Sequence, residues 1–250
     1  MGRILLVRHG QASLFAADYD TLSPLGVEQS RLLGAYWAER GALFTRAYVG
    51  PRRRHRQTHD AVAAVYRDAG LAWPEAHDVP ALDEHDGPRV VEEVLRTAAA
   101  DTAAVSGVEL AAALVGAPVV EAAAATVAEL DERRRVYLRE FTRVTRQWAR
   151  GELEAPGIES FGEFRTRVEG GVRAMCAAGG ADGTVVAFTS GGPVAAAAGL
   201  ALELANVKTL ELSWAVSNSS VSEFLVSGER FSLSVFNATP HVAADQFTMV

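Results

Sequence analysis

The stretch LLVRHGQA, residues 5–12, decides the fold of this chain. The apolar run Ile4–Val7 leads directly into Arg8, His9 and Gly10. A short apolar run that ends at a glycine is typical of a buried strand. The arginine and histidine at its end fit either an ordinary polar turn or a phosphate pocket with a histidine nucleophile.

The apolar pattern after this strand alternates between strands and helices. We expect helices at 23–41, 55–67 and 160–178, strands at 46–51 and 79–82, and a hairpin at 220–237 that turns at Ser227 and Gly228. The segment GTVVAFTSGG, residues 183–192, repeats the opening pattern of an apolar strand followed by glycine, and a further helix follows it. The sequence therefore predicts an α/β three-layer sandwich, in which helices flank a mostly parallel central sheet with an antiparallel edge.

The middle of the chain differs in composition from the rest. Residues 89–150 are rich in Ala, Val, Glu and Arg, and the pattern predicts one long helix over 118–151. No linker rich in Pro, Gly or Ser brackets this stretch. We therefore expect a single domain, residues 1–250, with a helical insertion at about 88–155.

Length and charge limit the classes of protein to consider. The chain has 250 residues and a net charge of −7, which argues against nucleic acid or an anionic membrane as a partner. Its single cysteine, Cys176, excludes an internal disulfide and fits a reducing compartment. No secretory signal is visible, so we expect a cytoplasmic protein. The sequence does not indicate an oligomeric state.

Chemically capable residues follow the predicted strands. The segments are RHG at 8–10, GPRRRHRQT at 50–58, LDEHDG at 82–87 and TSGG at 189–192. Ligands of open α/β sheets bind beyond the carboxyl ends of the strands. Arginine side chains match phosphate oxygens, and a helix N-terminus adds amide donors. A neutral imidazole can attack phosphorus, and a carboxylic acid can protonate the leaving oxygen. This set predicts phosphoryl transfer on a small phosphorylated substrate, with no metal and no cofactor.

The motifs together resemble the histidine phosphatase superfamily, also called phosphoglycerate-mutase-like. The resemblance is carried by LLVRHGQA, LSPLGVEQSRLLG, GPRRRHRQT, ALDEHDG and PGIESFGEFRTRV. The third of these is similar to the family pattern Ser-Pro-x-x-Arg-Ala-x-Gln-Thr, with Gly50 in place of the serine. The resemblance implies a phosphatase that hydrolyses phosphomonoesters through a phosphohistidine intermediate.

The resemblance also implies a role for each matching residue. His9 is the nucleophile and Glu84 the proton donor, with Asp83 and Asp86 as competitors for the second role. Arg8 and Arg54 clamp the phosphoryl oxygens. Gly10 lets the main chain pass close to the phosphate, and Ser190 and Gly191 complete the anion pocket.

Ser190 is a departure from the family pattern, which has a second histidine at this position. A hydroxyl donates a hydrogen bond but brings no charge, and the loss of a charge-assisted donor typically lowers the rate by about 10²–10³. We therefore expect a slow enzyme. His85 and His241 are candidates to replace the missing imidazole, and a simple helix cap is the alternative role for Ser190.

Other features leave two alternative functions open. Phe15 stands where phosphoglycerate mutases carry an asparagine, which argues against a mutase. The missing histidine leaves a non-catalytic phospholigand-binding or regulatory module as a second alternative. Three further histidines have no metal-ligand spacing and fit surface or packing positions: His55, His59 and His77.

Overall fold

The computed structural model describes residues 1–250 except 13–19, 102–126, 154, 181 and 250. The chain forms two compact units, one made of Met1–Glu84 together with Arg165–Val250 and the other of His85–Phe164. The second unit holds helices α3 (Gly87–Asp101) and α6 (Val127–Arg150) and the beginning of α7. The expected single domain with a helical insertion at about 88–155 stays a prediction.

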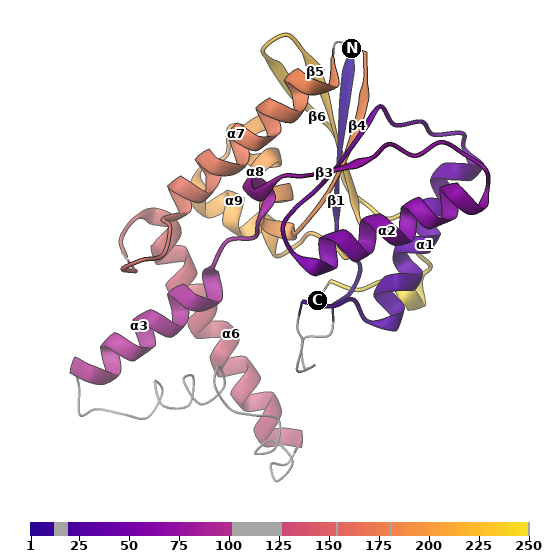
Figure 1. Ribbon diagram of the computed structural model, residues 1–250. Helices are drawn as coiled ribbons and strands as arrows, with labels where there is room; N and C mark the ends of the chain where they lie inside the picture. Colours follow the sequence, from indigo (N-terminus) through magenta and orange to yellow (C-terminus); the bar gives the residue numbers. More distant parts are fainter. Residues whose placement is uncertain (13–19, 102–126, 154, 181, 250) are drawn as a thin grey trace. The chain divides into compact units, whose positions relative to one another are not determined.

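The first unit is built on one six-stranded sheet of order β3-β2-β4-β1-β5-β6 (Figure 1). The strands are β1 (Gly2–Arg8), β2 (Arg46–Val49), β3 (Ala76–Asp78), β4 (Thr184–Thr189), β5 (Val221–Ser227) and β6 (Arg230–Ala238). Strands β3, β2, β4 and β1 pair in parallel, whereas β5 and β6 pair antiparallel at one edge. The predicted α/β fold with a mostly parallel sheet is confirmed.

Helices lie on both sides of this sheet. Figure 1 shows α1 (Pro24–Glu39) and α2 (Arg53–Asp68) on one side, and α7 (Phe161–Gly179), α8 (Gly191–Ala201) and α9 (Asn206–Ser213) on the other. The core beneath α1 and α2 joins Leu33, Trp37, Val62 and Tyr66 of the helices to alternate residues of the strands, among them Leu5, Val7, Val49 and Phe188. Alternation of this kind directs every second side chain of a strand to the same face.

Local signals explain where the first helix begins. Ser23 occupies the N-cap of α1, and its hydroxyl accepts the N–H of Gly26 at 3.0 Å. Pro24 follows at the first helical position, where the missing N–H is of no consequence. The amphipathic pattern and the cap together place α1 where the sequence predicts it.

Two expected elements differ from the structure. Residues 79–82 are not a strand: Pro80–Leu82 form a 3-10 helix, and β3 ends just before it at Asp78. Pro80 has no N–H to donate to a neighbouring strand, so the ladder ends there. The predicted helix over 118–151 is described only from Val127 onward, and its first residues lie outside the described part of the chain.

The predicted hairpin is present, with its turn at Gly228 and Glu229. Gly228 has a φ of 60°, a conformation that a glycine adopts without strain. None of the described helices is long and apolar enough to cross a membrane.

Candidate active site

Three loops meet at the carboxyl edge of the parallel strands. In the sheet register Arg8 pairs with Thr189, and Val49 pairs with Phe188. The residues that follow β1, β2 and β4 therefore emerge side by side, as open α/β sheets require of a ligand site. A fourth segment joins them, because the hydroxyl of Thr189 donates to the carbonyl oxygen of Leu82 at 2.7 Å.

His9 is buried at the centre of this edge, with 5% of its surface exposed. Its Nδ1 lies 2.7 Å from the carbonyl oxygen of Gly10. A carbonyl oxygen only accepts hydrogen bonds, so Nδ1 carries the proton and Nε2 keeps its lone pair. Burial lowers the pKa of His9 well below its ordinary value, and Arg8, Arg54 and His55 lower it further. The ring is therefore a neutral imidazole, which is the nucleophilic form.

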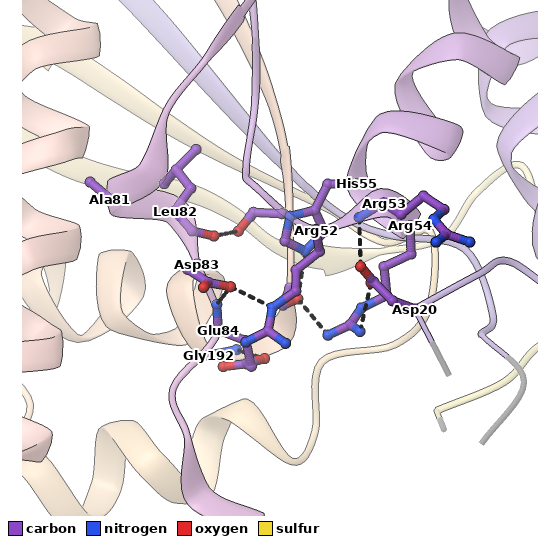
Figure 2. Close-up of polar contacts among 12 residues, drawn as sticks. Asp20, Arg52, Arg53, Arg54, His55, Ala81, Leu82, Asp83, Glu84 and Gly192 are labelled. Atoms are coloured by element: carbon purple, nitrogen blue, oxygen red, sulfur yellow. Dashed lines mark hydrogen bonds and ion pairs between the residues drawn. The ribbon is translucent and has the colours of Figure 1, made fainter. Parts of the chain in front are cut away.

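Arg54 is the buried cation of the site, and 4% of its surface is exposed. Its Nη1 lies 3.1 Å from Oδ1 of Asp20 (Figure 2). Its Nη2 donates to the Ser190 hydroxyl at 3.5 Å. The other oxygen of Asp20 accepts the N–H of Arg53, the first residue of α2, at 2.8 Å. Asp20 thus fixes the guanidinium at the start of this helix.

Arg8 lies beside the beginning of α8 but turns toward main-chain carbonyl groups. A Cβ added at Gly191 would lie 3.8 Å from Nε of Arg8. Nη1 of Arg8 donates to the carbonyl oxygen of Val216 and, at 2.6 Å, to that of Met249. The guanidinium is close to the start of α8, and its predicted role as a phosphate clamp stays a prediction.

Glu84 is the acid that lies against the N-terminus of α8. Its Oε2 accepts the N–H of Gly192, the second residue of that helix, at 3.0 Å (Figure 2). The two competing acids have other partners: Asp83 pairs with Arg52 at 2.5 Å, and Asp86 pairs with Arg89. Among the three acids, this contact with the N-terminal end of α8 distinguishes Glu84 as the proton-donor candidate.

Ser190 is not the simple helix cap that its position suggests. It occupies the N-cap of α8, but its side chain makes no capping hydrogen bond. Instead its Oγ lies 2.7 Å from Nε2 of His55. His55 is completely buried, and its ring centroid lies 5.8 Å from that of His9. The site therefore contains a second imidazole.

The two histidines expected to replace the missing imidazole have other contacts. His85 packs against the rings of Trp148, Phe161 and Phe164 within the second unit. His241 pairs with the Ser219 hydroxyl at 2.8 Å. The sequence contains one signal for His55: it stands where the family pattern Ser-Pro-x-x-Arg-Ala-x-Gln-Thr has its alanine.

Gly10 has a structural role that the sequence does not indicate, while its expected role beside the phosphate stays a prediction. A Cβ at this position would lie 2.2 Å from the carbonyl oxygen of Gly26, so two main chains meet here and α1 packs directly on the loop after β1. Glycine is required for this close approach between loop and helix. Phe15, used above to argue against a mutase, lies outside the described residues.

Among the described residues, no three His, Cys, Asp or Glu side chains lie together as a set that could hold a metal ion. The site instead holds a buried guanidinium, that of Arg54, and two buried imidazoles, those of His9 and His55. Such an arrangement can bind an anion and present a nucleophilic nitrogen to it.

We expect the free energy of unfolding to fall as the pH falls below about 6.5. Burial lowers the pKa of four histidines, His9, His55, His59 and His241, the last of them to about 4. The unfolded chain takes up protons at these groups from about pH 6.5 downward, while the folded chain does not. Each group then lowers the free energy of unfolding by up to about 1.4 kcal/mol per pH unit until its folded pKa is reached.

Urea denaturation at a series of pH values measures this effect. His241→Gln removes one of the four groups without touching the candidate site, so its free energy of unfolding should depend less steeply on pH than that of the wild type. Equal slopes for the two proteins would contradict the assignment for His241.

The chain is similar to known proteins both in sequence pattern and in fold. The chain matches the model of the histidine phosphatase superfamily (branch 1) over residues 121–239. A mutant of phosphoserine phosphatase from Entamoeba histolytica, solved in complex with phosphoserine, has 14% identity and a TM-score of 0.59, with 97% of this chain and 100% of that chain covered. Phosphoglycerate mutase from Bacillus anthracis has 15% identity and a TM-score of 0.57, with 96% and 94% covered.

A third solved structure, mycobacterial glucosyl-3-phosphoglycerate phosphatase, has 21% identity and a TM-score of 0.55, with 94% of this chain and 98% of that chain covered. A search of curated protein sequences finds no match. The family model and the phosphoglycerate-mutase-like fold together confirm the resemblance to the histidine phosphatase superfamily.

Proposed function

We propose that this chain is a phosphatase that hydrolyses small phosphomonoesters through a phosphohistidine at His9. One observation carries the proposal: Nδ1 of His9 is held by the Gly10 carbonyl, so the unprotonated Nε2 is left as a nucleophile in a buried cationic pocket. Two of the structural neighbours are phosphatases by name, which supports hydrolysis.

The reaction then has two steps. Nε2 of His9 forms a bond to phosphorus while the bond from phosphorus to the ester oxygen breaks, and Glu84 gives its proton to the leaving alkoxide. In the second step water attacks the phosphohistidine, Glu84 takes a proton from this water, and the nitrogen–phosphorus bond breaks. Inorganic phosphate leaves, and His9 and Glu84 return to their starting states.

The surrounding groups stabilise the charge on the transferring phosphoryl group. The buried guanidinium of Arg54 is fixed by Asp20 before substrate arrives, so little reorganisation accompanies the reaction. The first residues of α8, including Gly191, add the positive end of a helix.

A screen of the purified chain against many phosphomonoesters tests the proposal, with released phosphate as the measurement. Turnover that is lost in His9→Ala supports it. Interconversion of 3-phosphoglycerate and 2-phosphoglycerate without phosphate release would indicate a mutase instead. Tight binding of vanadate without turnover of any substrate would indicate a non-catalytic phospholigand-binding module.

We expect chelation to leave the activity unchanged. The charge on the phosphoryl oxygens is offset by the guanidinium of Arg54 and the end of α8, so the mechanism has no step that requires a metal ion. Dialysis against EDTA followed by the phosphatase assay measures this. Loss of activity that is restored by a divalent ion would contradict the mechanism.

A further inference from the structure

We propose that His55 is the second imidazole of this phosphate pocket, and that it acts through the Ser190 hydroxyl in place of the histidine that the family pattern has at position 190. The inference rests on the proposed function, because it concerns the same pocket. It makes His55 a positioning residue, whose partner Ser190 touches the phosphoryl group.

The first argument is the position of the Ser190 oxygen. It lies 2.7 Å from Nε2 of His55 and 3.5 Å from Nη2 of Arg54, so the imidazole and the guanidinium meet on one hydroxyl. The His55 ring in turn lies 5.8 Å from the ring of His9, centroid to centroid. All of these groups are buried, so the hydroxyl is held at one place beside the nucleophile.

The second argument is the space that His55 occupies. A Cβ added at Gly50 would lie 2.5 Å from Nδ1 of His55, closer than two such atoms can approach. A serine at position 50, as in the family pattern, would therefore collide with this imidazole. Glycine at 50 and histidine at 55 stand in one motif, serine at 190 is far from both in the sequence, and the three departures meet at one point. Together they indicate that the second imidazole, which the family pattern has at the start of α8, comes in this chain from the first turn of α2.

The third argument concerns which groups donate the hydrogen bonds at the Ser190 hydroxyl. Burial, Arg54 and Arg52 hold the pKa of His55 well below its ordinary value, so the ring is a neutral imidazole. In this proposal the ring proton lies on Nε2, so that the ring donates to the Ser190 oxygen and the hydroxyl keeps its own proton for a phosphoryl oxygen. A hydrogen bond received in this way strengthens the one that the hydroxyl gives.

The experiment compares His55→Ala, His55→Gln and the double variant His55→Ala/Ser190→His with the wild type. His59→Gln is the matched control, since His59 is also a buried histidine of α2 but packs against Trp73 and Phe188 outside the site. The measurements are kcat and KM on one aryl phosphate and the inhibition constant of orthovanadate, after circular dichroism has shown that each variant is folded.

We expect His55→Ala to lower kcat/KM about 10²-fold and to weaken vanadate inhibition in parallel. His55→Gln keeps a donor near the same place, so its loss should be about tenfold. The double variant returns an imidazole to the pocket and should recover at least about tenfold over His55→Ala. Partial unfolding alone would lower the apparent kcat of His55→Ala but leave KM and vanadate inhibition unchanged.

The single variant Ser190→His should turn over more slowly than the wild type. Ser190 is only 1% exposed, and the ring of His55 already fills the space beside it. The inference is overturned if His55→Ala and His55→Gln match His59→Gln in kcat/KM and vanadate inhibition. It is also overturned if an acid-stable phosphoserine forms at Ser190, since His55 would then activate a serine nucleophile. A wild type that neither turns over a phosphomonoester nor binds vanadate would instead refute the proposed function itself.

Discussion

We expect His9→Ala to lower kcat at least about 10⁴-fold on any phosphomonoester that the wild type hydrolyses, because the variant loses the atom that accepts the phosphoryl group. The remaining groups of the site still bind the substrate. KM should therefore change far less than kcat, since Arg54 and the N-terminus of α8 are untouched. Steady-state kinetics on one aryl phosphate measures both.

A labelling experiment assigns the intermediate independently of the rate. The wild type is mixed with a ³²P-labelled substrate and denatured in alkaline detergent, which preserves phosphohistidine. The label should be lost on acid treatment and should be absent from His9→Ala. His77→Ala, a change at an exposed histidine of β3, is the control and should label like the wild type. Label that survives acid would place the intermediate on another residue.

The sequence predicts the parts of this site that depend on local patterns. The apolar strand before Arg8 and the cap at Ser23 are signals within a few residues, and the structure has β1 and α1 at those places. Parallel pairing then brings the loops after β1, β2 and β4 together, since the carboxyl ends of parallel strands share one edge.

Features that depend on packing between distant residues are not predictable in this way. The contact between His55 and Ser190 exists because Gly50 leaves room for the ring, and no spacing in the sequence shows that these three residues meet. The close approach of Gly10 to Gly26 is likewise a contact between a loop and a helix. The strand expected at 79–82 fails for a local reason that was visible, the proline at position 80.

We expect Arg54→Lys to lower kcat/KM about 10²-fold although the charge is kept, because a lysine cannot reproduce the planar fork of a guanidinium. In the structure the two ends of this fork point to different partners: Nη1 to Asp20 and Nη2 to Ser190. The single nitrogen of an ammonium group cannot occupy both ends of this fork. Since the positive charge still attracts the substrate, most of the loss should fall on kcat, with a smaller change in KM.

Arg56→Lys is the matched control for Arg54→Lys. Arg56 lies two residues further along α2, is half-exposed and pairs with Asp78, away from the residues that contact Ser190. Exposed ion pairs of this kind contribute little, so kcat/KM should stay within about twofold of the wild type. A comparable loss in both variants would point to a general effect on α2. If Arg54→Lys is as active as Arg56→Lys, the fixed fork does not stabilise the transferring phosphoryl group, and charge alone accounts for what Arg54 does.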